Sequence, residues 1–440
     1  MNISRCRPVA WLAALLLFLT GCSLDVESYL RPPRAQGDQQ AVQAALDTYI
    51  RDTAGTAQTY TLKYPSVGAH TSAFVLCDSH GRPVDGTDAN AASMAVVFYA
   101  FDTSREETHV NLLRRDGEEW VSVGDSVGYG TEIRQVAFGD LDGDGVAELL
   151  TGWSTYNSQN HRLGVFSVTT ELTALSTDRV YTQLFAGDLT GEGHDSLLLL
   201  HIGNGNKVTA TLEALKKNRL REVDTVRLDG FIQQFGDMTL WDMGDGRGLF
   251  VDAVKSAGTT ITELICWDGS RLRAPLYDRD SNQTTVTARA TGLAARDVDG
   301  DGILEVPRCT PLPGFNDENT GDPTAWLTVW RAYDYTADKW EDRLHTVVNT
   351  ADGYLVTLDD SRRQQTTTRY DATARTLDLV DTETDRVWLR LTAAEDGTGT
   401  GDAGSKVALL EATDSLPAVI GWYDSDLLDE EKVRYMLIRL

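Results

Sequence analysis

The stretch FGDLDGDGVAELLTGW, residues 138–153, alternates acidic side chains with other residues and then becomes apolar. Counted from Asp140, the candidate oxygen donors at positions 1, 3, 5, 7 and 9 are Asp140, Asp142, Asp144, the backbone carbonyl of Val146, and Glu148. Alternate carboxylates converge on one point only where the backbone turns sharply, and Gly145 permits that turn. Hard oxygen donors in this number favour Ca²⁺ over zinc or copper.

The loop recurs further along the chain. A second strong copy supplies Asp297, Asp299, Asp301, Ile303 and Glu305, and a weaker copy supplies Asp188, Thr190 and Glu192. We name these segments the Asp140 loop (140–148), the Asp297 loop (297–305) and the Asp188 loop (188–196). An EF-hand is excluded, because its loop needs a glutamate at position 12, where this chain has Thr151 and Arg308.

Degenerate copies near Asp78 and Asp242 complete the series, with successive first aspartates 62, 48, 54 and 55 residues apart. Ordinary Asp/Gly turns without calcium are expected at these two copies. A repeat of about fifty residues with a loop at a fixed place indicates one supersecondary unit used several times.

Each unit divides into four short strands without helices. After Asp140 and Asp188, the expected strands span 148–154, 162–169, 171–180, 182–188, 196–203, 207–215, 219–228 and 231–237. Four antiparallel strands per repeat are typical of a β-propeller blade. The sequence therefore predicts a mostly β fold, a propeller of five to seven blades, with strands near residues 59–64 and 72–77 closing the ring.

The two ends of the chain differ from this repeat. Arg5 and Arg7 precede an apolar run that ends in Leu-Thr-Gly-Cys at Cys22, which predicts a secretory signal peptide. That ending resembles the lipobox of bacterial lipoproteins and implies lipidation of Cys22; an ordinary signal peptide cut nearby is the alternative. The predicted divisions are 1–21 signal peptide, 22–37 tether, 38–58 N-terminal helix and linker, 59–347 propeller and 348–440 small α+β domain.

The repeated D-x-D-x-D-G-x-x-[DE] loop between strands resembles FG-GAP or VCBS repeats. These repeats form β-propellers with calcium in the blade loops, as in the propeller of integrin α chains. Together with the lipobox, the pattern resembles uncharacterised VCBS-repeat lipoproteins of Gram-positive, clostridia-like bacteria. The resemblance covers roughly residues 70–310 and is strong at the Asp140 and Asp297 loops.

The composition narrows the choice of partners. The net charge of −26 becomes −28 once residues 1–21, which carry two arginines and no acids, are removed. Such a charge disfavours nucleic acid and anionic lipid as partners and suits cation binding. Besides Cys6 and Cys22, the chain has Cys77, Cys266 and Cys309, which allow at most one disulfide and form no zinc-binding spacing.

No catalytic motif is found. Gly124-Asp125-Ser126-Val127-Gly128 matches G-x-S-x-G but is followed by a β pattern instead of the helix that a nucleophile elbow needs. The seven histidines form no paired motif. Trp153, Tyr156, Asn157, Asn160 and His161 could line a sugar or peptide site, although a Trp packed between blades beside a polar hairpin is favoured.

We therefore expect a lipid-anchored protein on the extracytoplasmic face of the cell membrane, with structural Ca²⁺. Its expected role is non-catalytic binding of a glycan, peptide or protein ligand. The alternatives are a polysaccharide-acting enzyme, either hydrolase or lyase, and a purely structural role.

Overall fold

The computed structural model describes residues 38–84, 92–103, 107–154, 158–244, 246–255, 258–315, 322, 324–394, 405–413 and 415–440. The predicted signal peptide and tether, the lipidation site Cys22, and Tyr156 and Asn157 lie outside this part of the chain. No helix in the described ranges combines the length and apolar character needed to cross a bilayer.

Three sheets of four antiparallel strands, joined in sequence order, form the middle of the molecule. They are β6 (Glu132–Gly139), β7 (Glu148–Ser154), β8 (His161–Ser167) and β9 (Thr173–Tyr181); β10 (Gln183–Gly187), β11 (Ser196–Gly203), β12 (Lys207–Leu215) and β13 (Leu220–Leu228); and β14 (Ile232–Asp242), β15 (Arg247–Lys255), β16 (Thr260–Trp267) and β17 (Leu272–Arg273). A mostly β fold of four-stranded antiparallel sheets is thus confirmed.

The strand patterns follow from the position of each strand in its sheet. Every residue of β7 is buried, because this second strand is covered on both faces by neighbouring sheets. The fourth strand β13 instead shows polar, exposed positions along most of its length. An apolar second strand therefore carries the core, and a polar fourth strand faces solvent.

The first sheet contains five strands. They are β1 (Tyr60–Leu62), β2 (Phe74–Cys77), β3 (Met94–Phe101), β4 (His109–Asp116) and β5 (Glu119–Val127). Both β1 and β2 pair with β3, so they share one edge. Helix α3 (Asp38–Ala54) packs its apolar side on this sheet through Val42, Leu46 and Ile50, which are fully or almost fully buried.

Two five-stranded sheets form the C-terminal part. One contains β18 (Glu305–Pro311), β19 (Trp326–Asp334), β20 (Lys339–Asn349), β21 (Tyr354–Thr357) and β27 (Leu437–Arg439). The other contains β22 (Thr366–Asp371), β23 (Thr376–Asp381), β24 (Val387–Ala394), β25 (Ser405–Leu410) and β26 (Ala418–Tyr423). Helix α4 (Glu430–Met436) begins after Asp429, whose side chain accepts a hydrogen bond from the Lys432 amide. The division predicted at residue 347 stays a prediction; β20 crosses this position and pairs with β21, and β21 pairs with β27.

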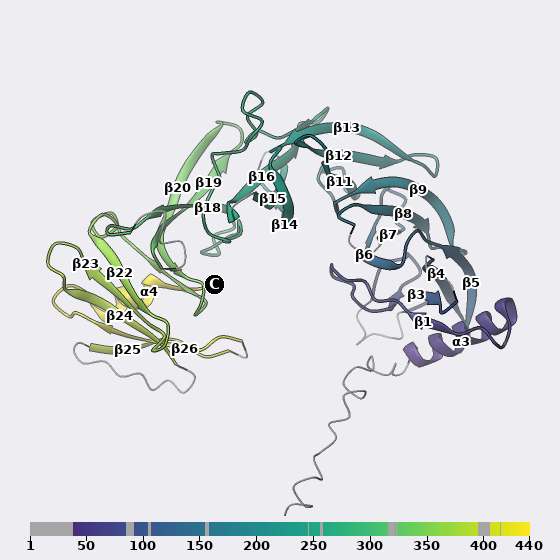
Figure 1. Ribbon diagram of the computed structural model, residues 1–440, viewed down its shortest axis with the longest axis horizontal. Coiled ribbons are helices and arrows are strands. Elements are labelled where there is room, and N and C mark those ends of the chain that lie inside the picture. Colours follow the sequence, from purple (N-terminus) through teal and green to yellow (C-terminus); the bar gives the residue numbers. More distant parts are fainter. Residues whose placement is uncertain are drawn as a thin grey trace, which may run out of the picture.

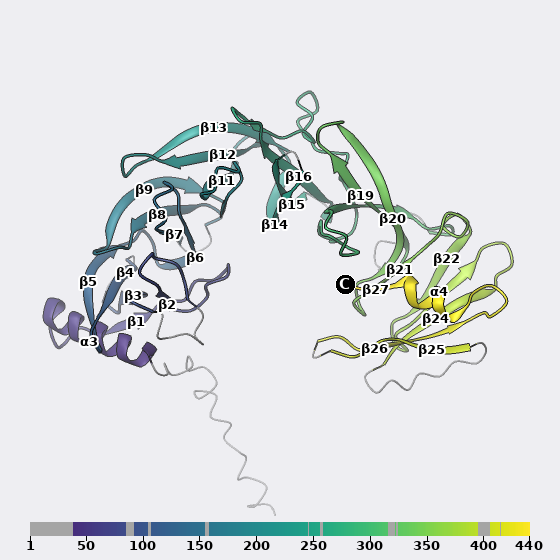
Figure 2. The same cartoon turned by 180° about the vertical axis from the view of Figure 1, so that it is seen from behind.

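The sheets form an open arc, not a closed ring (Figure 1, and from behind in Figure 2). The expectation of ring closure by N-terminal strands is not confirmed. Both β1 and β2 are used within the first sheet, and β27 is used next to β21. Within the described residues, no strand therefore links the N-terminal sheet to the C-terminal one.

Candidate functional site

The Asp140 loop joins β6 to β7 and is organised by its own carboxylates. Asp140 accepts hydrogen bonds from the amides of Gly143 (2.8 Å) and Gly145 (3.0 Å). Both glycines have positive φ, 78° and 87°, which a residue with a Cβ adopts only at a cost. The glycine positions therefore let the loop curl around its first aspartate, as the spacing predicted.

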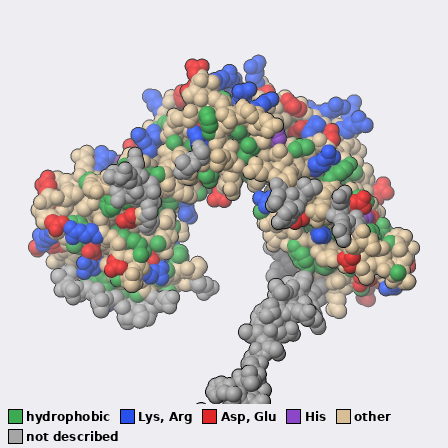
Figure 3. Space-filling view, in the orientation of Figure 1, with side chains coloured by type: hydrophobic (Ala, Val, Ile, Leu, Met, Phe, Trp, Pro, Cys, Tyr) green, Lys and Arg blue, Asp and Glu red, His purple; other side chains and the backbone are tan. Residues whose placement is uncertain are grey.

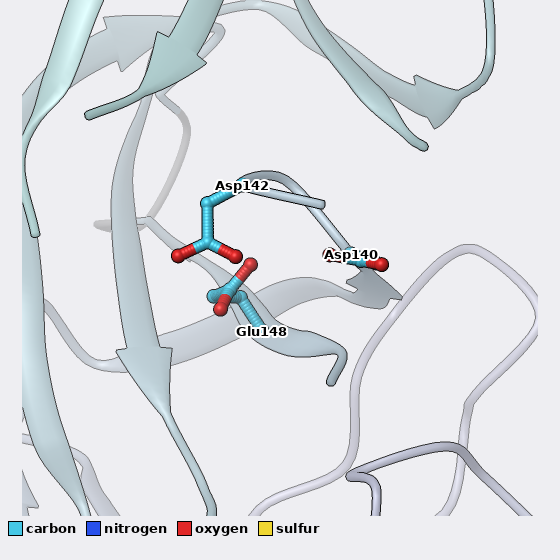
Figure 4. Close-up of side chains that lie close together, drawn as sticks. All are labelled: Asp140, Asp142 and Glu148. Carbon is cyan, nitrogen blue, oxygen red and sulfur yellow. The ribbon is translucent and has the colours of Figure 1, made fainter. Parts of the chain in front are cut away.

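Three of the predicted donors converge. Asp140, Asp142 and Glu148 each place a carboxylate oxygen within 4.8 Å of the others. Figure 4 shows the carboxylates of Asp142 and Glu148 close together, with Asp140 at the start of the loop. Asp144 lies outside this cluster and accepts a hydrogen bond from the Val146 amide at 2.8 Å. The structure thus brings together positions 1, 3 and 9.

The Asp297 loop repeats this arrangement before β18. Asp297, Asp299 and Glu305 also converge within 4.8 Å, and Asp297 accepts hydrogen bonds from the amides of Gly300 and Gly302. Asp301 is again outside the cluster: it accepts from the Ile303 amide and lies 2.6 Å from the Arg343 guanidinium. The same geometry has therefore formed at two loops from different parts of the chain.

The glutamates at position 9 lie in surroundings that a bound cation would stabilise. Burial raises the pKa of Glu148 and of Glu305 to about 7, opposed by one backbone amide each and reinforced by the loop aspartates. Glu305 is fully buried; its Oε2 accepts from the Val298 amide, but its Oε1 has no hydrogen-bond partner. A buried, unpaired carboxylate oxygen beside two further carboxylates is costly unless a cation satisfies it. The donor set, all oxygen, fits Ca²⁺.

In the Asp188 loop, the first aspartate is paired with an arginine instead of with further carboxylates. Asp188 accepts from the Gly191 and Gly193 amides, but its carboxylate also contacts the Arg247 guanidinium at 2.7 Å. Glu192 contacts His194 at 3.4 Å, and the Thr190 hydroxyl is buried without a partner. In the part of the chain that the structure describes, these side chains form no acidic cluster.

The degenerate copies are turns. The Asp78 carboxylate accepts from the amides of His80 and Arg82, and that of Asp242 accepts from the Gly244 amide. The Asp78 turn also contacts the Asp140 loop, since the Ala147 amide donates to the His80 carbonyl at 2.8 Å.

The remaining candidates from the sequence, Ser126, Trp153 and the cysteines, lie in strands or are buried in the packed interior. Ser126 lies in β5 opposite Val110, so the G-x-S-x-G match is part of a strand. Trp153 is 1 % exposed and packs edge-on against Phe166. The three cysteines in the described residues are unbonded, and burial raises the pKa of each.

A polar groove lies at the opposite end of the same sheets, and part of its wall comes from the stretch 151–164 that the sequence analysis weighed as a sugar or peptide site. The starts of β6, β10 and β14 and the start of β8 meet there around a volume of about 340 Å³. Its lining includes Glu132, Arg134, His161, Gln183 and Gln234. The local pattern named His161 alone among these five, because they come from four strands of three sheets.

The groove combines a neutral imidazole with an arginine that has no ion pair. Burial, and then the charge of Arg134, lower the pKa of His161 to about 4, so its ring is neutral at pH 7. Arg134 forms no ion pair among the described side chains; its guanidinium reaches only the Ser66 hydroxyl, at 3.5 Å. Behind the groove, His161 Nδ1 and the Tyr181 hydroxyl are buried without hydrogen-bond partners. Such a site offers a neutral imidazole and an unpaired guanidinium to a bound molecule.

Among known proteins, similarity to this chain is found with solved structures. No family model matches the chain, and no curated protein does. Rhamnogalacturonan lyase YesW is 14 % identical with a TM-score of 0.32, over 80 % of this chain and 68 % of that one. A rhamnogalacturonan lyase of Bacillus licheniformis is 12 % identical (TM-score 0.30; 76 % and 71 % covered). A β-1,3-galactosidase is 11 % identical (TM-score 0.27; 87 % and 93 % covered).

These findings contradict the expectation of a non-catalytic binding protein and of a chain without enzymatic activity, since the similar structures are two lyases and a galactosidase. At these TM-scores the likeness assigns no activity to this chain. The expectation was wrong because sequence motifs consist of residues that are close along the chain, whereas the residues that line a groove between sheets come from distant strands.

Proposed function

We propose that the protein is a lipid-anchored, extracytoplasmic enzyme that cleaves a uronate-containing polysaccharide by elimination in the polar groove, on a scaffold stabilised by calcium. The observation that carries the proposal is the pairing, in one groove, of the neutral His161 with the unpaired Arg134.

The chemistry follows from what these two groups can do. Arg134 binds the uronate carboxylate and so acidifies the adjacent C5–H bond. His161 takes the C5 proton, the C4–O bond breaks, and a C4=C5 double bond forms. The imidazolium then gives the same proton to the departing glycosidic oxygen, which returns His161 to its neutral form. No water and no other reactant is consumed.

Hydrolysis is the less suitable reaction for this groove. Glycoside hydrolysis uses a pair of carboxyl groups, about 5–5.5 Å apart in retaining enzymes and about 6.5–9.5 Å apart in inverting ones. Among the described residues that line the groove, Glu132 is the single carboxylate. A lyase needs a base and a cation instead, and we assign these roles to His161 and Arg134.

Calcium at the Asp140 and Asp297 loops, as in FG-GAP or VCBS repeats, is the structural part of the proposal. The clustered carboxylates would bind the ion, with backbone carbonyls such as those of Val146 and Ile303 completing the shell. The unpartnered Glu305 Oε1 supports this role. The Asp188 loop is left out, because Arg247 already neutralises its first aspartate.

The activity is tested by incubating the protein, with millimolar calcium, with uronate polysaccharides and with neutral ones. The unsaturated product is followed by its ultraviolet absorbance. Product is expected from a uronate polymer only, and His161→Ala should reduce the rate by about 10²–10⁴-fold. His80→Ala, at the far end of the sheets, is the matched control. Reducing ends without ultraviolet absorbance, or an unchanged rate in His161→Ala, would refute elimination.

The anchor is tested separately. Cys22→Ser should move the protein from the membrane fraction to the soluble fraction of a bacterial host. Retention of the variant in the membrane fraction would contradict anchoring through a lipid on Cys22.

A further inference from the structure

A second groove, of about 680 Å³, lies on the outer side of the arc, between β13 and the segment that follows β17. We name it the basic groove and define it by Arg227, Arg271 and Arg279 with Tyr277 and Tyr335, which are among its lining residues. Figure 3 shows Lys and Arg side chains gathered along this upper edge, above β13.

The basic groove gathers unpaired positive charge in a chain that has 66 acidic and 40 basic side chains. Elsewhere, Arg179, Arg375 and Arg390 each lie 2.6 Å from a carboxylate. Within the described ranges, Arg227, Arg271 and Arg279 form no ion pair, and the arginine beside them, Arg273, is neutralised by Asp268 at 2.6 Å.

The single acidic residue among the described lining residues of the basic groove, Asp224, already accepts a hydrogen bond from the backbone. Oδ2 of Asp224 accepts this bond from the Leu272 amide at 2.9 Å. The Tyr277 hydroxyl donates to Asn282 at 2.7 Å, which fixes the ring in place. Three unpaired guanidinium groups therefore share one depression with two aromatic rings.

We propose that the basic groove binds an acidic polysaccharide. Its arginines form bidentate contacts with uronate carboxylates, and its tyrosine rings stack on the faces of the sugar rings. Guanidinium forks match carboxylates in planar geometry, and aromatic rings supply flat apolar area for sugar rings. The groove lies on the outer strands, whereas the catalytic groove lies where inner strands begin. The basic groove is therefore a second site that holds the polymer without cleaving it, and the choice of a uronate polymer rests on the proposed function.

The test measures binding in the His161→Ala variant, so that cleavage does not interfere. Binding of polygalacturonate, of a neutral galactan and of polyphosphate is compared at fixed calcium concentration, by calorimetry at two salt concentrations. Polygalacturonate should bind, more weakly at high salt, and Arg227→Ala, Arg271→Ala and Arg279→Ala should each weaken its affinity about tenfold. The triple variant Arg51→Ala, Arg114→Ala, Arg308→Ala removes equal charge elsewhere and should bind as before.

Three outcomes would overturn the proposal: unchanged affinity in a variant with all three groove arginines replaced, equal binding of the neutral galactan, or tighter binding of polyphosphate. Anionic phospholipid vesicles form a further arm, and their capture in preference to polygalacturonate would assign the groove to a membrane surface instead. Failure of the proposed elimination is seen separately, because wild-type protein would then bind polygalacturonate without producing unsaturated sugar.

Discussion

Arg247 neutralises Asp188, the first aspartate of the Asp188 loop. Its Nη1 lies 2.7 Å from Asp188 Oδ2 and 2.8 Å from the Asp188 carbonyl oxygen, to which it donates. In the Asp297 loop, by contrast, Glu305 Oε1 is buried without a partner. One chain therefore contains a loop whose first aspartate pairs with an arginine and two loops whose carboxylates cluster where a metal ion could bind.

Calcium should stabilise the protein through the two clusters. At 1 mM calcium, a site with a dissociation constant on the order of 0.1–1 mM adds about 0.4–1.4 kcal/mol to the free energy of unfolding. Asp140→Ala and Asp297→Ala should each remove the stabilisation that calcium gives at one loop, and the two losses should add in the double variant. Thermal melting with calcium and with a chelator measures both losses. A melting temperature that the chelator leaves unchanged would exclude structural calcium.

Arg247→Ala should lower stability whether or not calcium is present. The variant leaves the Asp188 carboxylate with backbone amides alone, and the expected loss is about 1 kcal/mol, because the arginine is partly exposed. Denaturant unfolding of Arg247→Ala, Asp188→Asn and the double variant measures the coupling between the two residues. If calcium fully rescued Arg247→Ala, the loop would be a metal site after all.

The stability of the protein should depend on pH through Glu263, which is fully buried and accepts hydrogen bonds from the Asp229 amide and the Thr284 hydroxyl. Burial raises the pKa of Glu263 from 4.5 to about 7. Folding therefore favours the protonated acid, and stability is lost as pH rises from the unfolded pKa through the folded one. The loss reaches about 3 kcal/mol by pH 8.

Glu263→Gln removes this titration and can keep the two hydrogen bonds to its oxygen. The difference in unfolding free energy between the variant and the wild type should accordingly move in favour of the variant between pH 5 and pH 8. Denaturant melts at both pH values, with calcium constant, provide the measurement. A difference that is independent of pH would show that Glu263 is ionised in the fold.

Gly164 should not tolerate a side chain. A Cβ at this position would overlap the ring of Trp153, which is buried between sheets. Gly164→Ala should cost about 1–3 kcal/mol in a denaturant melt, since a packed core does not absorb an added methyl group. Gly292→Ala is the control, because nothing lies within 4 Å of its added Cβ; equal melts for both variants would contradict the packing.

The sequence was a good guide where the information is local. Residues 148–154, 196–203 and 207–215 were expected as strands and are strands with these bounds. The clusters at Asp140 and Asp297 follow from spacing within nine residues. Position 5 is different: Asp301 instead contacts Arg343, 42 residues away, and no local pattern reveals such a partner.

Features that depend on several sheets could not be predicted. Ring closure depends on which strand the chain ends pair with, and β27 pairs with β21. The polar groove depends on Arg134 and His161 meeting across β6 and β8. Periodicity defines which face of a strand is buried, but not which other sheet lies beside its end.

The hydrogen bonds between the acidic loops have a mechanical consequence. Asp195 and Asp140 exchange two of them, at 2.8 and 3.0 Å, and the Asp78 turn and Arg247 add links on either side. These links join neighbouring sheets at the end that carries the acidic loops, and buried apolar clusters join the same sheets along the rest of their length. The spacing of the three sheets at the polar groove is therefore fixed by the fold. A polymer lying across Glu132, Gln183 and Gln234 would contact three sheets that are already held in place.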